Sequence, residues 1–238
     1  MQPNLLLCEL HAHTTWSDGA LTLTELVELY GRHEFDVLCI TDHVLRSDVQ
    51  RYRLQPRTYP HYLATIEREA RRAREQYDLL VIPGVELTHL APNPDDAGHA
   101  LAIGLRDHCS LDHGLEPAMG AARDAGAAIV AAHPHGPRDD PNYARTTRWF
   151  SRNWQRLDGL VDRYELFNRD QTFGWVAEAR LPGIASGDFH RPEHLSTWKT
   201  LLPCPKTEEA VVAYLRSNAC AYVVPWHLRE TSRRRLAA

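Results

Sequence analysis

Short apolar runs, separated by helix-like segments, recur along almost the whole chain, and this alternation constrains the fold more than any other feature. The runs are nearly free of polar residues, as expected for parallel strands that are buried on both faces of a sheet. They cover residues 5–10, 37–41, 79–83, 100–104, 127–132, 160–166 and 184–186, with a weaker run at 221–224. The pattern predicts an α/β fold in which parallel strands alternate with helices.

The segments between the runs carry apolar residues at helical spacing, and the first begins at Thr24, a candidate N-cap. Predicted helices cover 24–32, 62–76, 115–125, 172–179 and 207–217. No repeat, low-complexity block or linker interrupts the series, so residues 1–238 are predicted to form one domain. Seven or eight strand–helix units favour closure into a barrel. Arg233, Arg234 and Arg235 mark residues 230–238 as a flexible basic tail.

The composition argues against several classes of protein. A net charge of −4 offers no basic surface for long nucleic acids, so a small molecule is the expected partner. The five cysteines include no Cys-x-x-Cys pair, which argues against a disulfide framework or a thiolate zinc site. No stretch approaches the roughly 18 apolar residues of a membrane span. We therefore expect a soluble, cytoplasmic protein, and the sequence specifies no oligomeric state.

Histidine and carboxylate residues gather where the predicted strands end. The motifs are HAHTTWSDG after the first run, TDH after the second, PGVE after the third, GHALAIG entering the fourth, AAHPH after the fifth and SGDFH after the seventh. They contribute His11, His13, Asp18, Asp42, His43, Glu86, His99, His133, His135, Asp188 and His190. Because the strand ends of a (β/α) barrel share one rim, we expect these side chains to converge there.

These residue types predict a metal centre. Imidazole and carboxylate groups suit zinc, manganese and iron, and the motifs contain no thiolate. His11 and His13 are two residues apart on a strand, so both side chains leave the same face and could bind one ion. A lone histidine is more often an ordinary hydrogen-bonded residue. That ordinary role does not explain why so many ligand-type residues stand just past apolar runs.

In order and spacing, HAHTTWSDG, TDH, GVE, AHP and SGDFH resemble the successive motifs of the PHP (polymerase and histidinol phosphatase) family, over residues 11–190. The resemblance implies a distorted, TIM-like (β/α)7 barrel with two or three divalent ions that hydrolyses phosphate esters. It assigns one ion to His11, His13, Glu86 and Asp188. It assigns a second ion to Glu86, as a bridge, with His99 and His133, and a third to Asp18, His43 and His190. His89 is a rival to His99, and Asp42 is expected to orient His43 or its strand end.

The chemistry of such a centre agrees with the resemblance. Two or three zinc, manganese or iron ions would neutralise phosphoryl oxygens and lower the pKa of a shared water to about 7. The resulting hydroxide would attack phosphorus in a phosphomonoester of a small metabolite or nucleotide. Asp18, His190 and His135 are the expected catalytic residues, and His135 could bind phosphate or protonate the leaving group. The candidates for holding phosphate oxygens are Arg138, Arg169 and Arg191.

Two other functions fit part of the pattern. Amidohydrolases, which cleave C–N bonds, also begin with His-x-His and end with Asp on a barrel. Their binuclear members typically bridge the metals with a carbamylated lysine on a middle strand. Here both lysines, Lys199 and Lys206, follow Asp188, which disfavours this class. A non-catalytic metal-binding barrel is expected to have lost ligands, and none is missing from the motifs.

Overall fold

The computed structural model describes residues 5–49, 54–138 and 147–227, so the tail predicted at 230–238 lies outside the described residues. The strands are β1 (Leu6–Glu9), β2 (Val37–Ile40), β3 (His43–Val44), β4 (Leu80–His89), β5 (Gly98–Ile103), β6 (Ala128–Ala132), β7 (Arg163–Asn168), β8 (Gln171–Thr172), β9 (Gly183–Ser186), β10 (Trp198–Leu202) and β11 (Tyr222–Pro225). The helices are α1 (Leu23–Arg32), α2 (Tyr59–Tyr77), α3 (Leu115–Asp124), α4 (Trp149–Asn153), α5 (Gly174–Glu178) and α6 (Glu208–Arg216). Every predicted strand and helix overlaps an observed one, whereas β3, β8, β10 and α4 have no predicted counterpart.

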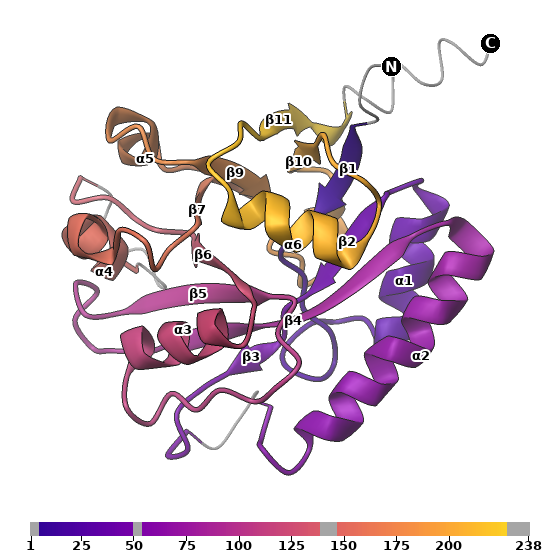
Figure 1. Ribbon diagram of the computed structural model, residues 1–238, viewed down its shortest axis with the longest axis horizontal. Helices are drawn as coiled ribbons and strands as arrows, with labels where there is room; N and C mark the ends of the chain where they lie inside the picture. The colour runs from indigo at the N-terminus through magenta and orange to yellow at the C-terminus, as the bar shows by residue number, and fades with distance from the viewer. Residues whose placement is uncertain (1–4, 50–53, 139–146, 228–238) are drawn as a thin grey trace.

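The sheet is mixed rather than parallel (Figure 1). Its strands follow the order β11-β10-β1-β2-β4-β5-β6-β7-β8, with β3 paired to β4 and β9 to β7. β5 runs antiparallel to both β4 and β6, and β10 runs antiparallel to β1. The prediction of parallel strands throughout is therefore wrong. At β5 the reason is a short connection, because residues 90–97 contain no helix to carry the chain back for a parallel pair.

The sheet curls until β1 approaches β9. Just beyond these strands, Ala12 and Phe189 form a parallel bridge, in which Phe189 N donates to His11 O at 2.9 Å. Further along the same edge, the hydroxyl of Thr200 accepts from Ala185 N at 2.9 Å and donates to Ala185 O at 2.7 Å. The Thr200 side chain of β10 thus makes the hydrogen bonds to β9 that a neighbouring strand's backbone would otherwise make. The described residues form a curled mixed sheet with helices around it, and a closed (β/α)7 barrel is not confirmed.

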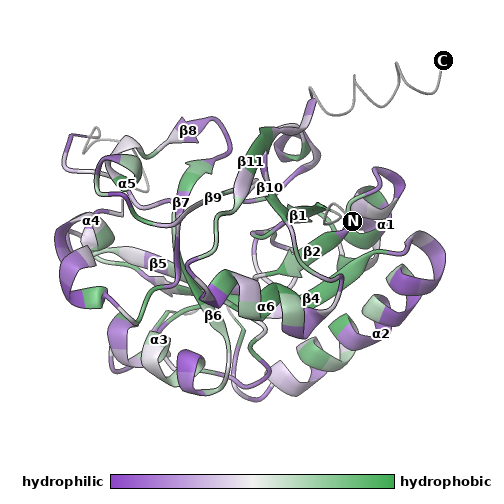
Figure 2. Ribbon diagram, turned by 45° about the horizontal axis from the view of Figure 1, so that its top comes forward, coloured by the Kyte–Doolittle hydropathy of each residue, from purple (hydrophilic) through white to green (hydrophobic). Residues whose placement is uncertain are grey.

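Two apolar clusters stabilise this arrangement on alternate residues of the same strands. One packs the sheet against α1, α2 and α3 and includes Leu26, Tyr62 and Met119 from these helices. The other includes inner strand residues and is covered by Val211 and Leu215 of α6. Figure 2 shows the hydrophobic strands in the centre and hydrophilic helix surfaces on the outside. The sheet is thereby held rigid beneath the residues that follow its strands.

Helix ends follow local capping chemistry. α1 begins with a capping box, in which Thr22 Oγ1 accepts from Glu25 N at 3.3 Å and Glu25 Oε2 accepts from Thr22 N at 2.8 Å. The N-cap is therefore Thr22 rather than Thr24. Thr207 caps α6 by accepting from Ala210 N at 3.2 Å. In the described part of the chain, no helix is both long and apolar enough to cross a membrane.

Candidate metal centre

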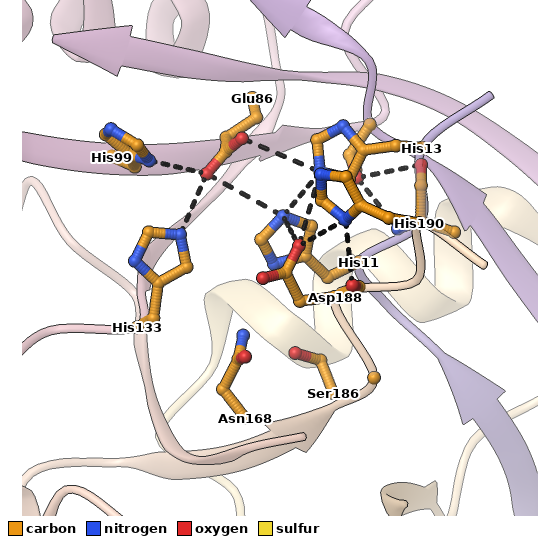
Figure 3. Close-up of polar contacts among 12 residues, drawn as sticks. His11, His13, Glu86, His99, His133, Asn168, Ser186, Asp188 and His190 are labelled. Atoms are coloured by element: carbon orange, nitrogen blue, oxygen red, sulfur yellow. Dashed lines mark hydrogen bonds and ion pairs between the residues drawn. The ribbon is translucent and has the colours of Figure 1, made fainter. Parts of the chain in front are cut away.

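Nine histidine and carboxylate side chains meet at one rim of the curled sheet (Figure 3). They fall into three groups, within each of which the ligand atoms lie within 4.8 Å of one another. The groups are His11, His13 and Asp188; Glu86, His99 and His133; and His13, Asp18, His43 and His190. These are the nine residues that the motifs predict as ligands. The grouping follows the three implied ions, except that His13 joins two groups and Glu86 falls in one.

The two histidines of the first motif face each other across their Nε2 atoms. His11 Nδ1 lies 2.9 Å from Glu165 Oε1, so the proton is on Nδ1. His13 Nδ1 lies 3.4 Å from Ser17 Oγ, which already donates to Asp42 Oδ1 at 2.5 Å and must therefore accept. The Nε2 atoms of the two rings then lie 3.0 Å apart. Burial lowers the pKa of His11, but Asp188 and Glu165 outweigh this effect and raise it, so a proton occupies the gap in the metal-free protein and a divalent cation bound by both nitrogens would take its place.

In the second group, too, a neighbouring side chain orients a histidine ring. Thr147 Oγ1 donates to His133 O at 2.7 Å, so it accepts from His133 Nδ1 at 3.3 Å. The ring consequently turns its Nε2 lone pair toward Glu86 Oε1, 3.2 Å away. His99 Nδ1 lies 3.1 Å from the same carboxylate oxygen. A carboxylate facing an imidazole lone pair also fits a shared cation.

The third group surrounds a carboxylate oxygen that is shielded from solvent. Asp18 Oδ1 lies 3.3 Å from His43 Nε2 and 3.2 Å from His190 Nε2. Burial raises the pKa of the Asp18 carboxyl, but these two rings outweigh this effect and hold it well below its usual range. The oxygen and the two ring nitrogens together fit a further cation.

Glu86 belongs to the second group and also approaches rings of the other two, and Figure 3 shows its contacts with His11 and His13. Its Oε1 is 3.7 Å from His11 Nε2, and its Oε2 is 3.6 Å from His13 Nε2 and 2.7 Å from His43 Nδ1. The sequence places Glu86 just after a strand, but it lies within β4, which continues to His89. The strand is longer because β3 pairs with it on one side, with His43 beside Glu86, and β5 on the other.

His99 reaches the rim for a reason that the motifs do not reveal. It stands near the start of its strand, whereas the other ligands follow their strands or lie toward their ends. Because β5 is antiparallel, its start lies at the rim, where His99 is in register with Thr88 of β4 and Ala132 of β6. The rival His89 belongs to none of the three groups.

The backbone of the rim is strained at three residues other than glycine. His133, Asp188 and Arg169 have φ angles of 29°, 42° and 52°, in the left-handed region. Each such conformation costs on the order of 1–3 kcal/mol and persists only where the surroundings impose it. Two of these residues belong to the ligand groups. The protein thus maintains the orientation of these ligands at a cost in stability.

The charges at the rim compensate one another. Burial lowers the pKa of His43, but Glu86 and Asp18 outweigh this effect and raise it to about 10. The pKa of His190 is raised to about 9 in the same way, by Asp18 and Asp188 against the effect of burial. Burial favours the neutral form of Glu86, yet the charge of His43 holds its pKa well below the usual range. Without a metal, protons on the rings therefore balance the carboxylates.

Glu165 of β7 is the main feature of the site that the sequence analysis missed. It is fully buried, and its Oε1 lies 2.9 Å from His11 Nδ1. Its Oε2 accepts from His133 N at 2.6 Å and from Asn168 Nδ2 at 2.7 Å, and the Ser186 hydroxyl donates to Oε1. One carboxylate thus joins candidate ligands from two groups. The sequence carries the signal, an acidic residue within the predicted strand at 160–166.

Asp42 orders the first motif rather than the ring of His43. It is fully buried and accepts from Thr14 N and Thr14 Oγ1, each at 2.8 Å, as well as from Ser17 Oγ. These bonds fix the turn that carries Asp18. The sequence predicts that Asp42 orients His43 or its strand end. In the structure its hydrogen bonds instead link the second motif to the first.

A cavity of about 680 Å³ opens over the groups and is lined by Glu86, His133, Asp188 and His190, among others. Its lining also includes His135, Arg169, Arg191 and His194. Thr147 N donates to His135 Nδ1 at 3.3 Å, so a neutral His135 ring carries its proton on Nε2.

The three candidate arginines differ in position. Arg169 lines the cavity, but its Nη2 lies 2.9 Å from Asp188 Oδ2 and also donates to Asp188 O, so it supports a candidate ligand. Arg191 is exposed at the cavity wall, with Nε 3.3 Å from His194 Nε2. Arg138 lines a separate cavity of about 530 Å³ with Trp154 and Trp175. The structure therefore does not bring Arg138 to the rim.

Comparisons with known proteins agree on the class of domain. The family model of the PHP domain matches residues 9–132, more than half of the chain. The search of curated proteins found no match. One similar solved structure is a two-domain protein from Bacteroides vulgatus that contains a predicted PHP-like metal-dependent phosphoesterase. It has a TM-score of 0.65 and 20% identity, over 93% of this chain and 65% of that chain. This chain therefore spans only about two thirds of that protein.

Two further solved structures are more distant. A proposed metal-dependent phosphoesterase from Bifidobacterium adolescentis has a TM-score of 0.50 and 17% identity, over 78% of this chain and 88% of that chain. An amidohydrolase from Chromobacterium violaceum, solved with sulfate and no metal, has a TM-score of 0.50 and 15% identity over the same shares. At such low identity these structures support the fold alone. The family match covers the segment from the first motif to the end of β6, and it shows that this chain belongs to the PHP domain family.

Proposed function

We propose that this chain is a metal-dependent phosphoesterase that hydrolyses a phosphomonoester of a small metabolite or nucleotide. The observation that carries the proposal is that the ligand groups are joined: His13 belongs to two of them, and Glu86 lies between all three. Joined groups hold cations a few ångströms apart, as two-metal phosphoryl transfer requires. The PHP domain family match agrees with this proposal, and two solved structures of similar fold are described as phosphoesterases.

The nine residues of the groups are proposed to hold two or three divalent ions. Nitrogen and oxygen donors without thiolate suit zinc, manganese or iron. When bound, such ions would neutralise phosphoryl oxygens and lower the pKa of a water molecule in the site. Neighbouring side chains orient three of the rings. Glu165 does so for His11 and Ser17 for His13. Thr147 does so for His133. The protein thereby turns one nitrogen of each of these rings toward the site.

The cavity wall opposite these groups is proposed to bind the rest of the substrate. A volume of about 680 Å³ suits a small molecule. Arg191 offers an exposed guanidinium to a phosphate oxygen, and His135 offers an Nε2 proton to the leaving group. Asp18 and His190, whose Oδ1 and Nε2 atoms lie 3.2 Å apart, are proposed to position the phosphate and the attacking water.

C–N bond hydrolysis of the amidohydrolase type is the alternative reaction. The positions of the lysines argue against it. Lys199 Nζ pairs with Glu9 Oε2 at 2.6 Å, and Lys206 Nζ with Asp36 Oδ1 at 3.2 Å. The chain has no other lysine, and neither belongs to a ligand group. No lysine is therefore placed to bridge two ions as a carbamate. A non-catalytic metal-binding role is disfavoured because all three groups are complete.

The test is turnover by metal-stripped protein supplied separately with manganese, iron or zinc. We expect phosphate release from members of a phosphomonoester panel, dependent on added metal and abolished by a chelator. A parallel panel of amides and cyclic ureides serves as the control. Turnover of the C–N substrates together with an inert phosphate panel would replace this proposal by the alternative.

The proposal extends to the way in which the strands close around the rim. β1, β2, β4, β5, β6, β7 and β9 follow one another around the rim to the Ala12–Phe189 bridge. We propose that they form a distorted seven-stranded barrel in a single domain.

A further inference from the structure

A buried ion pair joins β1 to β10 outside the three ligand groups. Lys199 Nζ lies 2.6 Å from Glu9 Oε2, and both side chains are completely buried. Removing two charges from water is costly, and apolar residues of similar volume often give equal or greater stability. Stability alone therefore does not account for the pair.

The other oxygen of Glu9 connects two segments of the metal centre. Glu9 Oε1 accepts from Gly187 N at 2.8 Å and from His11 N at 3.2 Å. Gly187 precedes Asp188, which belongs to the same ligand group as His11. Asp188 also has the left-handed φ of 42°, so its backbone must be held by its surroundings. One carboxylate thus fixes two ligand-bearing segments that come from opposite ends of the chain.

The remaining contacts of the ion pair keep this carboxylate in place. Tyr30 Oη donates to Glu9 Oε2 at 3.0 Å, and Lys199 Nζ donates to Thr197 Oγ1 at 2.7 Å. Gly187 allows the close approach, because a Cβ at this position would collide with Glu9 Oε2 and Lys199 Nζ. The carboxylate therefore has a donor on every side and a single geometry.

We propose that Glu9 and Lys199 are positioning residues of the metal centre. By holding the amides of His11 and Gly187, the pair sets the separation of the His11 and Asp188 side chains, and hence the affinity for the ion they share. Neither residue is a ligand; each acts through the backbone. The inference rests on the proposed metal-dependent function.

The test measures metal affinity in the absence of substrate, by competition for Mn²⁺ between a chelator and the full-length, metal-stripped protein. Glu9→Gln keeps the size of the side chain, but either orientation of the amide turns its NH2 toward a donor, Lys199 Nζ or Gly187 N. Lys199→Met removes the cation and keeps the length. We expect each variant to bind the ion of the His11–Asp188 group about 10–100-fold more weakly, as for other residues that support ligands.

Arg163→Met is the matched control. Arg163 is also a buried cation, but its guanidinium donates to carbonyls of α6 and of the segment that follows it, for example Leu215 O at 3.0 Å and Ser217 O at 2.7 Å. It begins β7, at the end of the strand away from the rim. We expect a lower Tm and wild-type Mn²⁺ affinity for this variant.

Glu9→Gln and Lys199→Met variants with a lower Tm but wild-type Mn²⁺ affinity would overturn the inference, because the pair would then be only structural. If Lys199→Met fails to fold, the affinity of Glu9→Gln decides the question alone. A wild-type protein that binds no Mn²⁺, Zn²⁺ or Fe²⁺ would refute the proposed function, and this inference with it. Wild-type binding with unchanged variants refutes the inference only.

Discussion

The two ends of β7 handle buried charge in opposite ways. At its start, the Arg163 guanidinium is satisfied by neutral carbonyls, including Leu215 O at 3.0 Å and Ala219 O at 2.7 Å. Toward the rim, Glu165 supports His11 and His133, whose Nε2 atoms face other candidate ligands. The first charge is hydrogen-bonded by neutral groups of the protein and caps the end of α6. The second helps to build a site in which protons hold the places that a cation could take.

This contrast separates stability from function along the strands. In barrels, residues at the strand starts serve mainly stability, and those at the strand ends serve the reaction. At the rim, His133 and Asp188 combine a left-handed backbone with membership of the ligand groups. Changes at the rim should therefore alter metal binding, and changes at the other end should alter unfolding.

Glu86→Gln should have the largest effect. The substitution keeps the size of the side chain but removes the charge that lies between the three groups, so cations there would repel one another with less compensation. We expect loss of metal and of nearly all turnover. Metal content and kcat are the measurements, and Glu193→Gln, the same change at an exposed residue of the cavity wall, is the control. Near-normal metal occupancy and kcat would mean that Glu86 does not bridge the ions.

Glu165→Gln should weaken metal binding without abolishing it. The amide can still accept from His11 Nδ1, but it lacks the charge that favours the proton on this nitrogen, and its NH2 opposes other donors. We expect about a 10–100-fold loss of metal affinity, the usual effect of changing a residue that orients a ligand. Chelator competition measures it. An unchanged affinity would show that the tautomer of His11 does not depend on Glu165.

Arg163→Met tests the other end of the comparison. Loss of the guanidinium leaves carbonyls at the end of α6 without a buried donor, at a cost of about 1–3 kcal/mol in the free energy of unfolding. We expect this change in urea denaturation, with kcat and metal content per folded chain unaltered. A variant of normal stability that has lost its metal would contradict the separation between the two ends.

The pH dependence of stability should change sign with metal. His43 and His190 have folded-state pKa values raised to about 10 and about 9. In metal-free protein their contribution is complete below the unfolded pKa of about 6.5 and is lost as pH rises through the folded values. Tm without metal should thus fall between pH 6.5 and 9, while the gain in Tm on adding metal should rise, because ions bind unprotonated rings. A metal-free Tm that increases over this range would contradict the balance of charges at the rim.

The sequence predicts the nine candidate ligands because each lies close to an apolar run, a relation that is local in the chain. It does not predict their partners, since Glu165 and Glu9 meet the rim only through folding. β10 escapes prediction for a related reason. Its polar residues Lys199 and Thr200 make it look unlike a buried strand, yet Glu9 and Ala185 satisfy them inside the fold. The direction of β5 depends on its connection to β4, not on its apolar pattern.

Arg138 shows where a motif misleads. It follows AAHPH closely in the sequence, but in the structure it lines a separate cavity with Trp154 and Trp175. Arg169 differs, because it does line the cavity, but the sequence does not predict its contact with Asp188.

The central claim is that the rim is a multinuclear metal centre, and elemental analysis of the purified wild-type protein tests it most directly. The account predicts at least two transition-metal ions per chain after metal loading, with phosphatase activity that disappears on chelation and returns on metal addition. Only trace metal after loading, with no activity regained, would contradict it.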